Sequence, residues 1–153
     1  MATPKRPKGP PKPVLYLDVL GALYVDRGGV PTKAAFAASF VDAVKGQFRL
    51  RILTCLEEHE ARALLKPFKI EPEYVPYRRA LGKASAIDFR EPFYWVEDDP
   101  SPADLLRLAD ARASDRIIAF TKRDGATEQT LKKLLATLAE HQCVVAPAAE
   151  AGK

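Results

Sequence analysis

The sequence predicts an α/β fold: a Rossmann-like three-layer sandwich in which a mainly parallel sheet carries helices on both faces. Short apolar runs typical of buried strands alternate along the chain with segments of helical composition. The connections between them are too short for anything but local crossovers. Hydrophobic residues make up 47% and charged residues 29% of the 153 residues, which is ordinary for one globular domain with a substantial core.

The first predicted strand is the apolar run Val14–Leu17, which ends at Asp18 and is followed closely by Gly21. A buried strand that ends in this way runs into a tight loop. Ligands of open α/β sheets bind outside the carboxyl ends of the strands, so Asp18 occupies the place of a ligand-binding group. The alternative is an aspartate that only caps a turn.

A loop is expected next over residues 24–31, followed by a helix over residues 34–45. Thr32 is the expected N-cap of this helix, and Gly46 ends it. Phenylalanine and valine recur within the helix at i, i+4 and i+8, so one of its faces is expected to be buried.

The second strand is expected at Leu50–Thr54 and the second helix at residues 57–65. Three prolines make residues 66–82 irregular, with a brief strand at Tyr74–Val75. Residues 82–87 are expected to form a short helix.

The next strand, Phe93–Val96, runs into the acidic residues Glu97–Asp99. Ser101 begins a helix, because proline follows it at the first helical position and an acid stands at the third. The last strand is expected over residues 116–120 and the last helix over residues 127–140.

Several chemically suggestive residues follow predicted strands: Asp18, Thr54, Lys83 and the acidic run Glu97–Asp99. The carboxyl ends of parallel strands share one edge of the sheet, so these groups can converge. A carboxylate nucleophile, a hydroxyl, an ammonium and an acidic metal clamp are the groups that phosphoryl transfer through an aspartyl intermediate requires. Carboxylates with backbone carbonyls suit Mg²⁺.

In this order the groups resemble the four motifs of the haloacid dehalogenase (HAD) superfamily over roughly residues 14–140. The first motif of the family pairs a strand with Asp-x-Asp-Gly, and here it is similar to Asp18–Gly21. The second motif is a Thr or Ser at a strand end, the third a Lys and the fourth an acidic pair. The chain looks similar, more narrowly, to the small HAD domain of Swiss Army Knife RNA repair proteins, through Trp95–Asp98 and the turn Asp124–Thr127.

The resemblance implies a role for each matching residue. Asp18 is the nucleophile and a ligand of Mg²⁺, and the backbone carbonyl of Leu20 is a second ligand. Thr54 and Lys83 hold the phosphate. One of the two acids Glu97 and Asp98 completes the metal site, although a glutamate stands where the family usually begins with aspartate.

Leu20 departs from the pattern, because it replaces the second aspartate of the first motif. In phosphatases of the family that aspartate protonates the leaving group and then activates water. General acid–base catalysis of this kind is worth about 10²–10⁴-fold, and leucine supplies neither step. Three interpretations stay open: a slow phosphatase, a reaction that needs no acid at this position, and an inactive binding or interaction module with the same fold.

The HAD-like domain is expected to lack a cap, since the two usual insertion sites, residues 24–31 and 66–82, are too short for a folded one. An open site favours a phosphate on a macromolecule, either a nucleic-acid end or a phosphoprotein. A receiver-like domain is the rival fold, but it needs an early acidic pair and an acceptor aspartate midway, and this chain has its acidic pair late.

Residues 1–13 are expected to form a disordered basic arm, because they combine five prolines with four basic residues and no acid. The arm accounts for the whole net charge of +4, so the rest of the chain sums to about zero. Such an arm can bind a polynucleotide electrostatically. The single domain is expected over residues 14–146 and a flexible tail over residues 147–153.

No apolar run approaches the roughly 20 residues that span a bilayer, and the N-terminus lacks the apolar stretch of a secretory signal. Cys55 and Cys143 have no metal-binding spacing and need no disulfide, so the expected compartment is the reducing cytoplasm. His59 and His141 are expected to be exposed and Trp95 to lie in the core. The sequence sets no oligomeric state.

Overall fold

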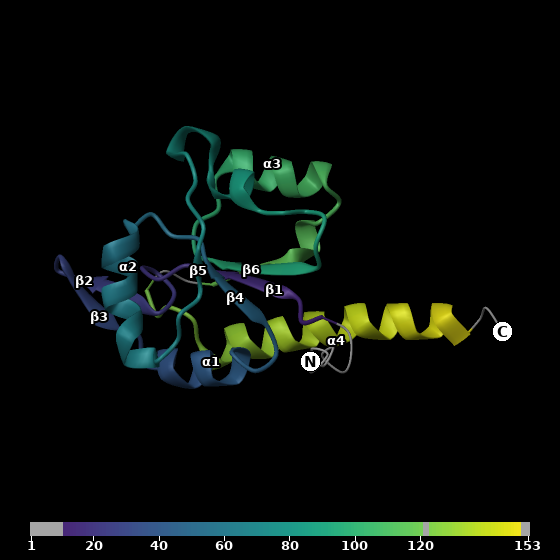
Figure 1. Cartoon of the computed structure of the whole chain (residues 1–153), viewed down its shortest axis with the longest axis horizontal. Helices are drawn as coiled ribbons and strands as arrows, with labels where there is room; N and C mark the ends of the chain where they lie inside the picture. The colour runs from purple at the N-terminus through teal and green to yellow at the C-terminus, as the bar shows by residue number, and fades with distance from the viewer. Residues whose placement is uncertain (1–10, 121–122, 151–153) are drawn as a thin grey trace, which may run out of the picture.

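The computed structural model describes residues 11–120 and 123–150, with the side chains up to residue 142. Its main feature is a five-stranded sheet of order β5-β4-β1-β6-β7 in which every neighbouring pair is parallel. The α/β prediction is confirmed (Figure 1). The strands are β1 (Val14–Leu17), β4 (Arg49–Ile52), β5 (Glu73–Tyr74), β6 (Phe93–Glu97) and β7 (Ile117–Ala119).

Helices cover both faces of the sheet, as expected for a three-layer sandwich. In Figure 1, α3 lies above the sheet and α1 and α4 lie below it. Among the described helices, none is both long and apolar enough to cross a membrane. The helices are α1 (Ala37–Val44), α2 (Glu58–Leu65), α3 (Pro102–Asp110) and α4 (Glu128–Glu150).

The buried side chains form two clusters, one on each face, because successive side chains of a strand point to opposite faces. Leu15 and Leu17 of β1 belong to the larger cluster, with side chains from α1, α2 and α4. Val14 and Tyr16 belong to the smaller cluster under α3, where Trp95 is fully buried, as predicted.

Strand β1 is the middle strand of the sheet, and the carboxyl ends of its neighbours lie beside its own. Leu17 pairs with Ile52 of β4 on one side and with Val96 of β6 on the other, so the three carboxyl ends are level. From β1 the chain builds β4 and β5 on one side, and then returns to build β6 and β7 on the other. The crevice between β1 and β6 is therefore the topological switch point, where open α/β sheets bind ligands.

The stretch expected to be a loop after β1 is instead an antiparallel hairpin of β2 (Tyr24–Arg27) and β3 (Val30–Lys33). Gly28 and Gly29 form its turn, both with positive φ. Two turn residues with positive φ favour a tight hairpin whose twist matches that of the strands. Thr32 consequently lies in β3, and the prediction that it caps a helix was wrong.

The predicted start of α3 is confirmed and is a complete capping box. The Ser101 hydroxyl accepts a hydrogen bond from the Asp104 backbone N–H at 3.1 Å, and the Asp104 carboxylate accepts one from the Ser101 N–H at 3.0 Å. Asp104, at the third helical position, is 3% exposed, which is unusual for an aspartate.

The buried carboxylate of Asp104 also joins α3 to the preceding 3₁₀ helix η3 (Lys83–Ala86), the short helix expected over residues 82–87. Its second oxygen accepts a hydrogen bond from the Ala84 backbone N–H at 2.8 Å. Gly82 has a φ of +79°, and a Cβ at this position would collide with that same oxygen. Asp104 therefore sets the position of the turn that carries Lys83.

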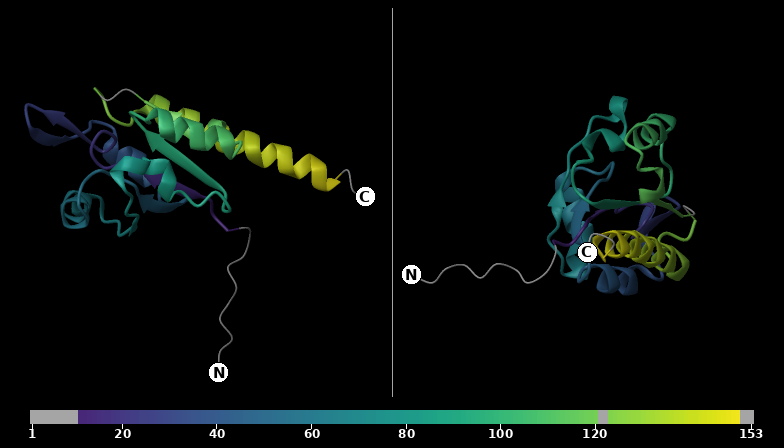
Figure 2. Two further views of the ribbon diagram at one scale, coloured as in Figure 1. Left: turned by 90° about the horizontal axis from the view of Figure 1, so that it is seen from above. Right: turned by 90° about the vertical axis from the view of Figure 1, so that its right-hand side faces the viewer.

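Helix α4 begins as predicted, next to hydrogen bonds between Thr127 and Thr130, but it continues to Glu150, past its expected end at residue 140. Figure 2 shows that its C-terminal part extends beyond the sheet. Most of the predicted basic arm, residues 1–10, and residues 151–153 of the predicted tail lie outside the described residues.

His141 is not exposed, contrary to expectation. Its ring stacks on Tyr94 with the centroids 5.6 Å apart, and its Nδ1 lies 2.6 Å from the Tyr94 hydroxyl. Its Nε2 lies 2.7 Å from a carboxylate oxygen of Asp115. His141 therefore fastens α4 to the sheet, whereas the side chain of His59 is 77% exposed, as predicted.

We predict that Asp104→Ala lowers the free energy of unfolding by about 2–3 kcal/mol, because a helix cap is lost and the buried Ala84 N–H loses its acceptor. Urea denaturation measures this loss. Asp110→Ala, an exposed change in the same helix, is the control and should cost about 0.5 kcal/mol or less. Equal effects of the two substitutions would contradict the bridging role of Asp104.

Candidate functional site

The site is built around a buried lysine that bridges two carboxylates. Asp18 directly follows β1 and Glu97 ends β6, and each is 2% exposed. The Lys83 Nζ lies 2.6 Å from Asp18 Oδ2 and 2.8 Å from Glu97 Oε2. The structure thus brings three of the predicted residues together at the switch point.

The charges of this group are strongly coupled. Burial raises the pKa of Asp18, and the nearby Lys83 opposes the rise. Burial and the neighbouring Asp18 raise the pKa of Glu97 to about 8, against the pull of Lys83. Burial alone would lower the pKa of Lys83, but the two carboxylates outweigh it and hold this pKa above its usual value. One ammonium therefore faces two acids, and the two carboxyl groups of Asp18 and Glu97 together tend to retain a proton.

The acidic groups fit a divalent cation. One carboxylate oxygen each of Asp18, Glu97 and Asp98 lies within 4.8 Å of the others. The Oδ1 atom of Asp18 is buried and has no hydrogen-bond partner among the described residues. An unpaired buried oxygen is costly, and a bound cation would satisfy it. An all-oxygen donor set with carboxylates suits a hard ion such as Mg²⁺.

Gly21 makes room for Asp98. It has a φ of +103°, and a Cβ at this position would lie 3.0–3.1 Å from the atoms of the Asp98 carboxyl group. The glycine after the first strand is therefore required both by the turn and by the acid that lies against it. Leu20, one residue earlier, is half-buried and packs against the larger core cluster.

These residues surround a cavity of about 260 Å³ at the carboxyl edge of the sheet. Leu20 contributes an apolar wall to it, so no titratable side chain stands at that position. The cavity is lined by Asp18, Leu20, Gly21, Asp26, Cys55, Lys83, Glu97, Asp98 and Asp99.

Thr54 lies at the same edge, where its hydroxyl is close enough to Asp18 to help lower the pKa of that carboxyl, although the residue lines a neighbouring cavity. It follows β4, it is 1% exposed, and its hydroxyl accepts a hydrogen bond from the Leu56 N–H at 3.4 Å. It lines a neighbouring cavity of about 250 Å³, which also contains Cys55. Since Cys55 lines both cavities, the two adjoin.

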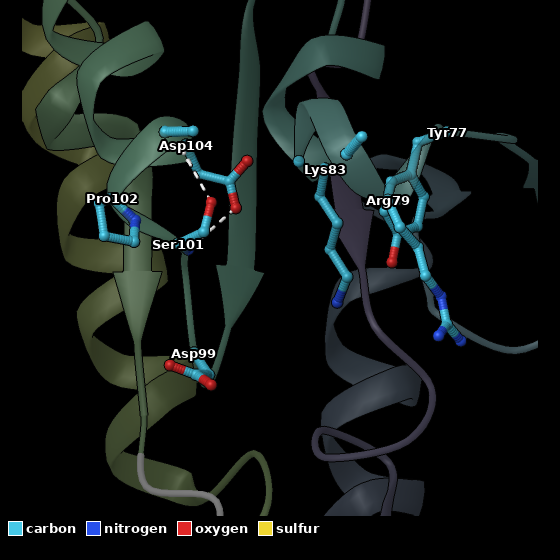
Figure 3. Close-up of a pocket in the computed structure, with 10 residues that line it drawn as sticks. Tyr77, Arg79, Lys83, Asp99, Ser101, Pro102 and Asp104 are labelled. Carbon is cyan, nitrogen blue, oxygen red and sulfur yellow. Dashed lines mark hydrogen bonds between the residues drawn. The ribbon is translucent and has the colours of Figure 1, made fainter.

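A third cavity, of about 360 Å³, adjoins the site on the side of α3 and shares Lys83 and Asp99 with it (Figure 3). Tyr77 and Arg79 line this cavity and were not singled out by sequence reasoning. The one feature of the sequence that could have pointed to them is the Tyr-Arg-Arg run shortly before Lys83, in a segment predicted to be irregular. Asp26 of the hairpin was missed because the hairpin itself was not predicted.

The fold and the site together define a parallel α/β protein with a lysine-bridged acidic cluster at its switch point. No family model matches the chain. No curated protein matches it either. Among solved structures, the crystal structure of a hypothetical protein from Xanthomonas campestris is similar, with 16% sequence identity, over 89% of this chain and 88% of that chain, at a TM-score of 0.48.

We predict that without metal the protein becomes less stable as the pH rises from 6 to 8. The pKa of Glu97 is about 8 in the folded protein against an ordinary 4.5, so between these values only the folded state holds the proton, and the stability that is fully present below about pH 4.5 falls until about pH 8. A retained proton is worth about 1.4 kcal/mol per pH unit within this window. Urea denaturation in EDTA measures the slope.

The matched variant for this prediction is Glu97→Gln, which keeps the shape of the side chain but cannot titrate. Its stability should vary less steeply between pH 6 and pH 8 than that of the wild type. Parallel curves for the two proteins would show that Glu97 holds no proton in the folded state.

Proposed function

We propose that this chain is a Mg²⁺-dependent, HAD-like phosphohydrolase-type protein with an open site and reduced activity. The proposal is carried by one observation: Lys83 bridges Asp18 and Glu97 at the switch point, beside a third acid, Asp98. A nucleophilic carboxylate, an ammonium and a set of acidic ligands within one small cavity meet the needs of phosphoryl transfer.

In this proposal each residue has a distinct role. A carboxylate oxygen of Asp18 attacks phosphorus, so an acyl phosphate forms on Asp18 as the bond from phosphorus to the leaving oxygen breaks. The Lys83 ammonium leaves its carboxylate partners in part and binds the phosphoryl oxygens. The Thr54 hydroxyl orients the same oxygens from the adjoining cavity. Water then attacks the phosphorus of the acyl phosphate, so the phosphorus–oxygen bond to Asp18 breaks and inorganic phosphate leaves. Solvent supplies the proton of the leaving oxygen in the first step and takes up the proton of the attacking water in the second.

Asp18, the carbonyl of Leu20, Glu97 and Asp98 would hold the Mg²⁺ ion. When bound, the ion neutralises negative charge on the phosphoryl oxygens. Without it, Lys83 is the cation that compensates Asp18 and Glu97 in the structure.

Leu20 explains why we expect the activity to be reduced. The residue lines the cavity with an apolar side chain, so it cannot donate a proton to the leaving oxygen or activate the hydrolytic water. Loss of such a group costs about 10²–10⁴-fold in rate. Substrates whose leaving group needs no proton should suffer least.

The same observation favours a second candidate function, a binding or interaction module without turnover. In this case the cavity binds a phosphorylated ligand through Lys83 and the acidic cluster, and Leu20 marks the loss of chemistry. In either case, the open site favours a phosphate at the end of a nucleic acid in the cytoplasm, with the basic arm over residues 1–13 as an additional contact.

We predict that the wild type hydrolyses an aryl phosphomonoester slowly with Mg²⁺, that Asp18→Asn abolishes this activity, and that Leu20→Asp raises it by about 10²-fold or more. The aryl leaving group needs little protonation, so it reveals residual activity. The rate of product release at saturating substrate is the measurement.

Each other outcome has a definite meaning. A silent wild type with an active Leu20→Asp variant would show that the site still positions phosphate and metal, so the natural protein would be a binding module or would catalyse a reaction that needs no acid at this position. Unchanged activity in Asp18→Asn would contradict the proposed nucleophile. Silence of all three proteins would contradict the hydrolase proposal altogether.

A further inference from the structure

We propose that the cavity lined by Tyr77 and Arg79 binds the nucleotide that carries the phosphate, so that the ligand of the site is a phosphorylated end of a single-stranded nucleic acid. The inference rests on the proposed function and deepens it, because it assigns the recognition of the base and of the next phosphodiester to Tyr77 and Arg79, outside the phosphate site. The terminal phosphate lies at Lys83, the base stacks on Tyr77, and Arg79 binds the neighbouring phosphodiester.

The position of the cavity supports this assignment. Its volume of about 360 Å³ adjoins the phosphate site directly, because Lys83 and Asp99 line both. Figure 3 shows Lys83, Tyr77 and Arg79 on one side of the cavity, with the charged ends of Lys83 and Arg79 pointing the same way. A group attached to a phosphate at Lys83 therefore extends along Tyr77 toward Arg79.

Tyr77 has the properties of a stacking platform. It is half-buried and packs against the smaller core cluster, so its ring is held in place. It lines both the cavity of about 360 Å³ and the cavity of about 250 Å³, so part of the residue remains accessible to a ligand. Bases stack on such aromatic side chains whatever their identity, which suits binding without sequence preference.

Arg79 supplies a cation that the described part of the fold does not use. Arg79 is exposed and makes no salt bridge with the described residues. Among the described arginines, the salt bridges are made by Arg49, Arg51 and Arg90. A guanidinium matches the two free oxygens of a phosphodiester. Two cations, Lys83 and Arg79, on the same wall of one cavity thus favour a ligand with two phosphate groups.

The opposite wall favours a sugar between the phosphates. The Ser101 hydroxyl and the Asp104 carboxylate are already engaged in the capping box and with Ala84. Asp99 is exposed and only accepts hydrogen bonds, so it repels phosphate but binds hydroxyl groups. A ribose hydroxyl satisfies this acceptor, whereas a phosphopeptide offers no base for Tyr77.

The experiment is a titration of the full chain, with Mg²⁺, by four ligands of increasing size: inorganic phosphate, ribose 5-phosphate, a mononucleotide and a 5′-phosphorylated dinucleotide. In the three esters a methylenephosphonate replaces the terminal phosphate ester, so no turnover occurs. We expect affinity to rise about 10-fold from the sugar to the mononucleotide through stacking, and about 10-fold again for the dinucleotide through Arg79.

The variants separate these two gains. Tyr77→Ala should remove the gain of the mononucleotide over the sugar, and Tyr77→Phe should keep it. Arg79→Gln should remove only the gain of the dinucleotide. Arg78→Gln is the matched control: Arg78 is an exposed neighbour that lines none of the three cavities, so its loss should leave the dinucleotide gain intact.

The same titrations also distinguish a failure of the nucleotide subsite from a failure of the proposed function. If inorganic phosphate binds, and Lys83→Met loses this binding while its circular dichroism spectrum stays that of the folded protein, the phosphate site exists. Equal affinities for all four ligands would then overturn the inference alone. Equal binding of a phosphoserine peptide and the dinucleotide would likewise overturn it. Failure of inorganic phosphate to bind would overturn the proposed function and the inference together. A mononucleotide that binds as tightly as the dinucleotide would refute the role of Arg79.

Discussion

The bridge from Lys83 to Asp18 and Glu97 is the interaction on which the site depends. Asp18 and Glu97 are each 2% exposed and lie within 2.8 Å of one ammonium, so a single positive charge faces two buried acids, and the two acids together tend to retain a proton. Much of the local fold serves to keep that ammonium in place. Asp104 joins the start of α3 to the turn that carries Lys83, and Gly82 leaves space for the Asp104 carboxylate. In the proposed function, the metal ion would bind Asp18 and Glu97 and the phosphate would bind Lys83, so both would replace contacts of this bridge.

The sheet could be predicted from the sequence because its strands are short, apolar and buried on both faces. Leu15 and Leu17 face one core cluster while Val14 and Tyr16 face the other, so the strand reads as an unbroken apolar run. The parallel order then requires the strand ends to meet at one edge. The strand order alone therefore predicts that Asp18 lies close to Glu97 and Asp98 at the end of β6.

Other features depend on contacts that local sequence patterns do not report. The low apolar content of residues 24–33 predicts a loop rather than the hairpin β2–β3, although Gly28 and Gly29 provide the signal of a tight turn. His141 was predicted to be exposed from its charged surroundings, but it packs on Tyr94 across a long sequence separation. Tyr77 and Arg79 were missed for a related reason: they lie in an irregular segment, and only the tertiary fold brings them beside Lys83.

The most direct test of this account is calorimetric titration of the protein with Mg²⁺. We predict one bound ion per chain for the wild type and an affinity at least about tenfold weaker for Asp98→Asn, because a carboxylate ligand is lost. Asp110→Asn, an exposed change of the same chemistry in α3, should bind Mg²⁺ like the wild type. Absence of binding by the wild type, or identical binding by the wild type and Asp98→Asn, would contradict a metal–phosphate site at the switch point.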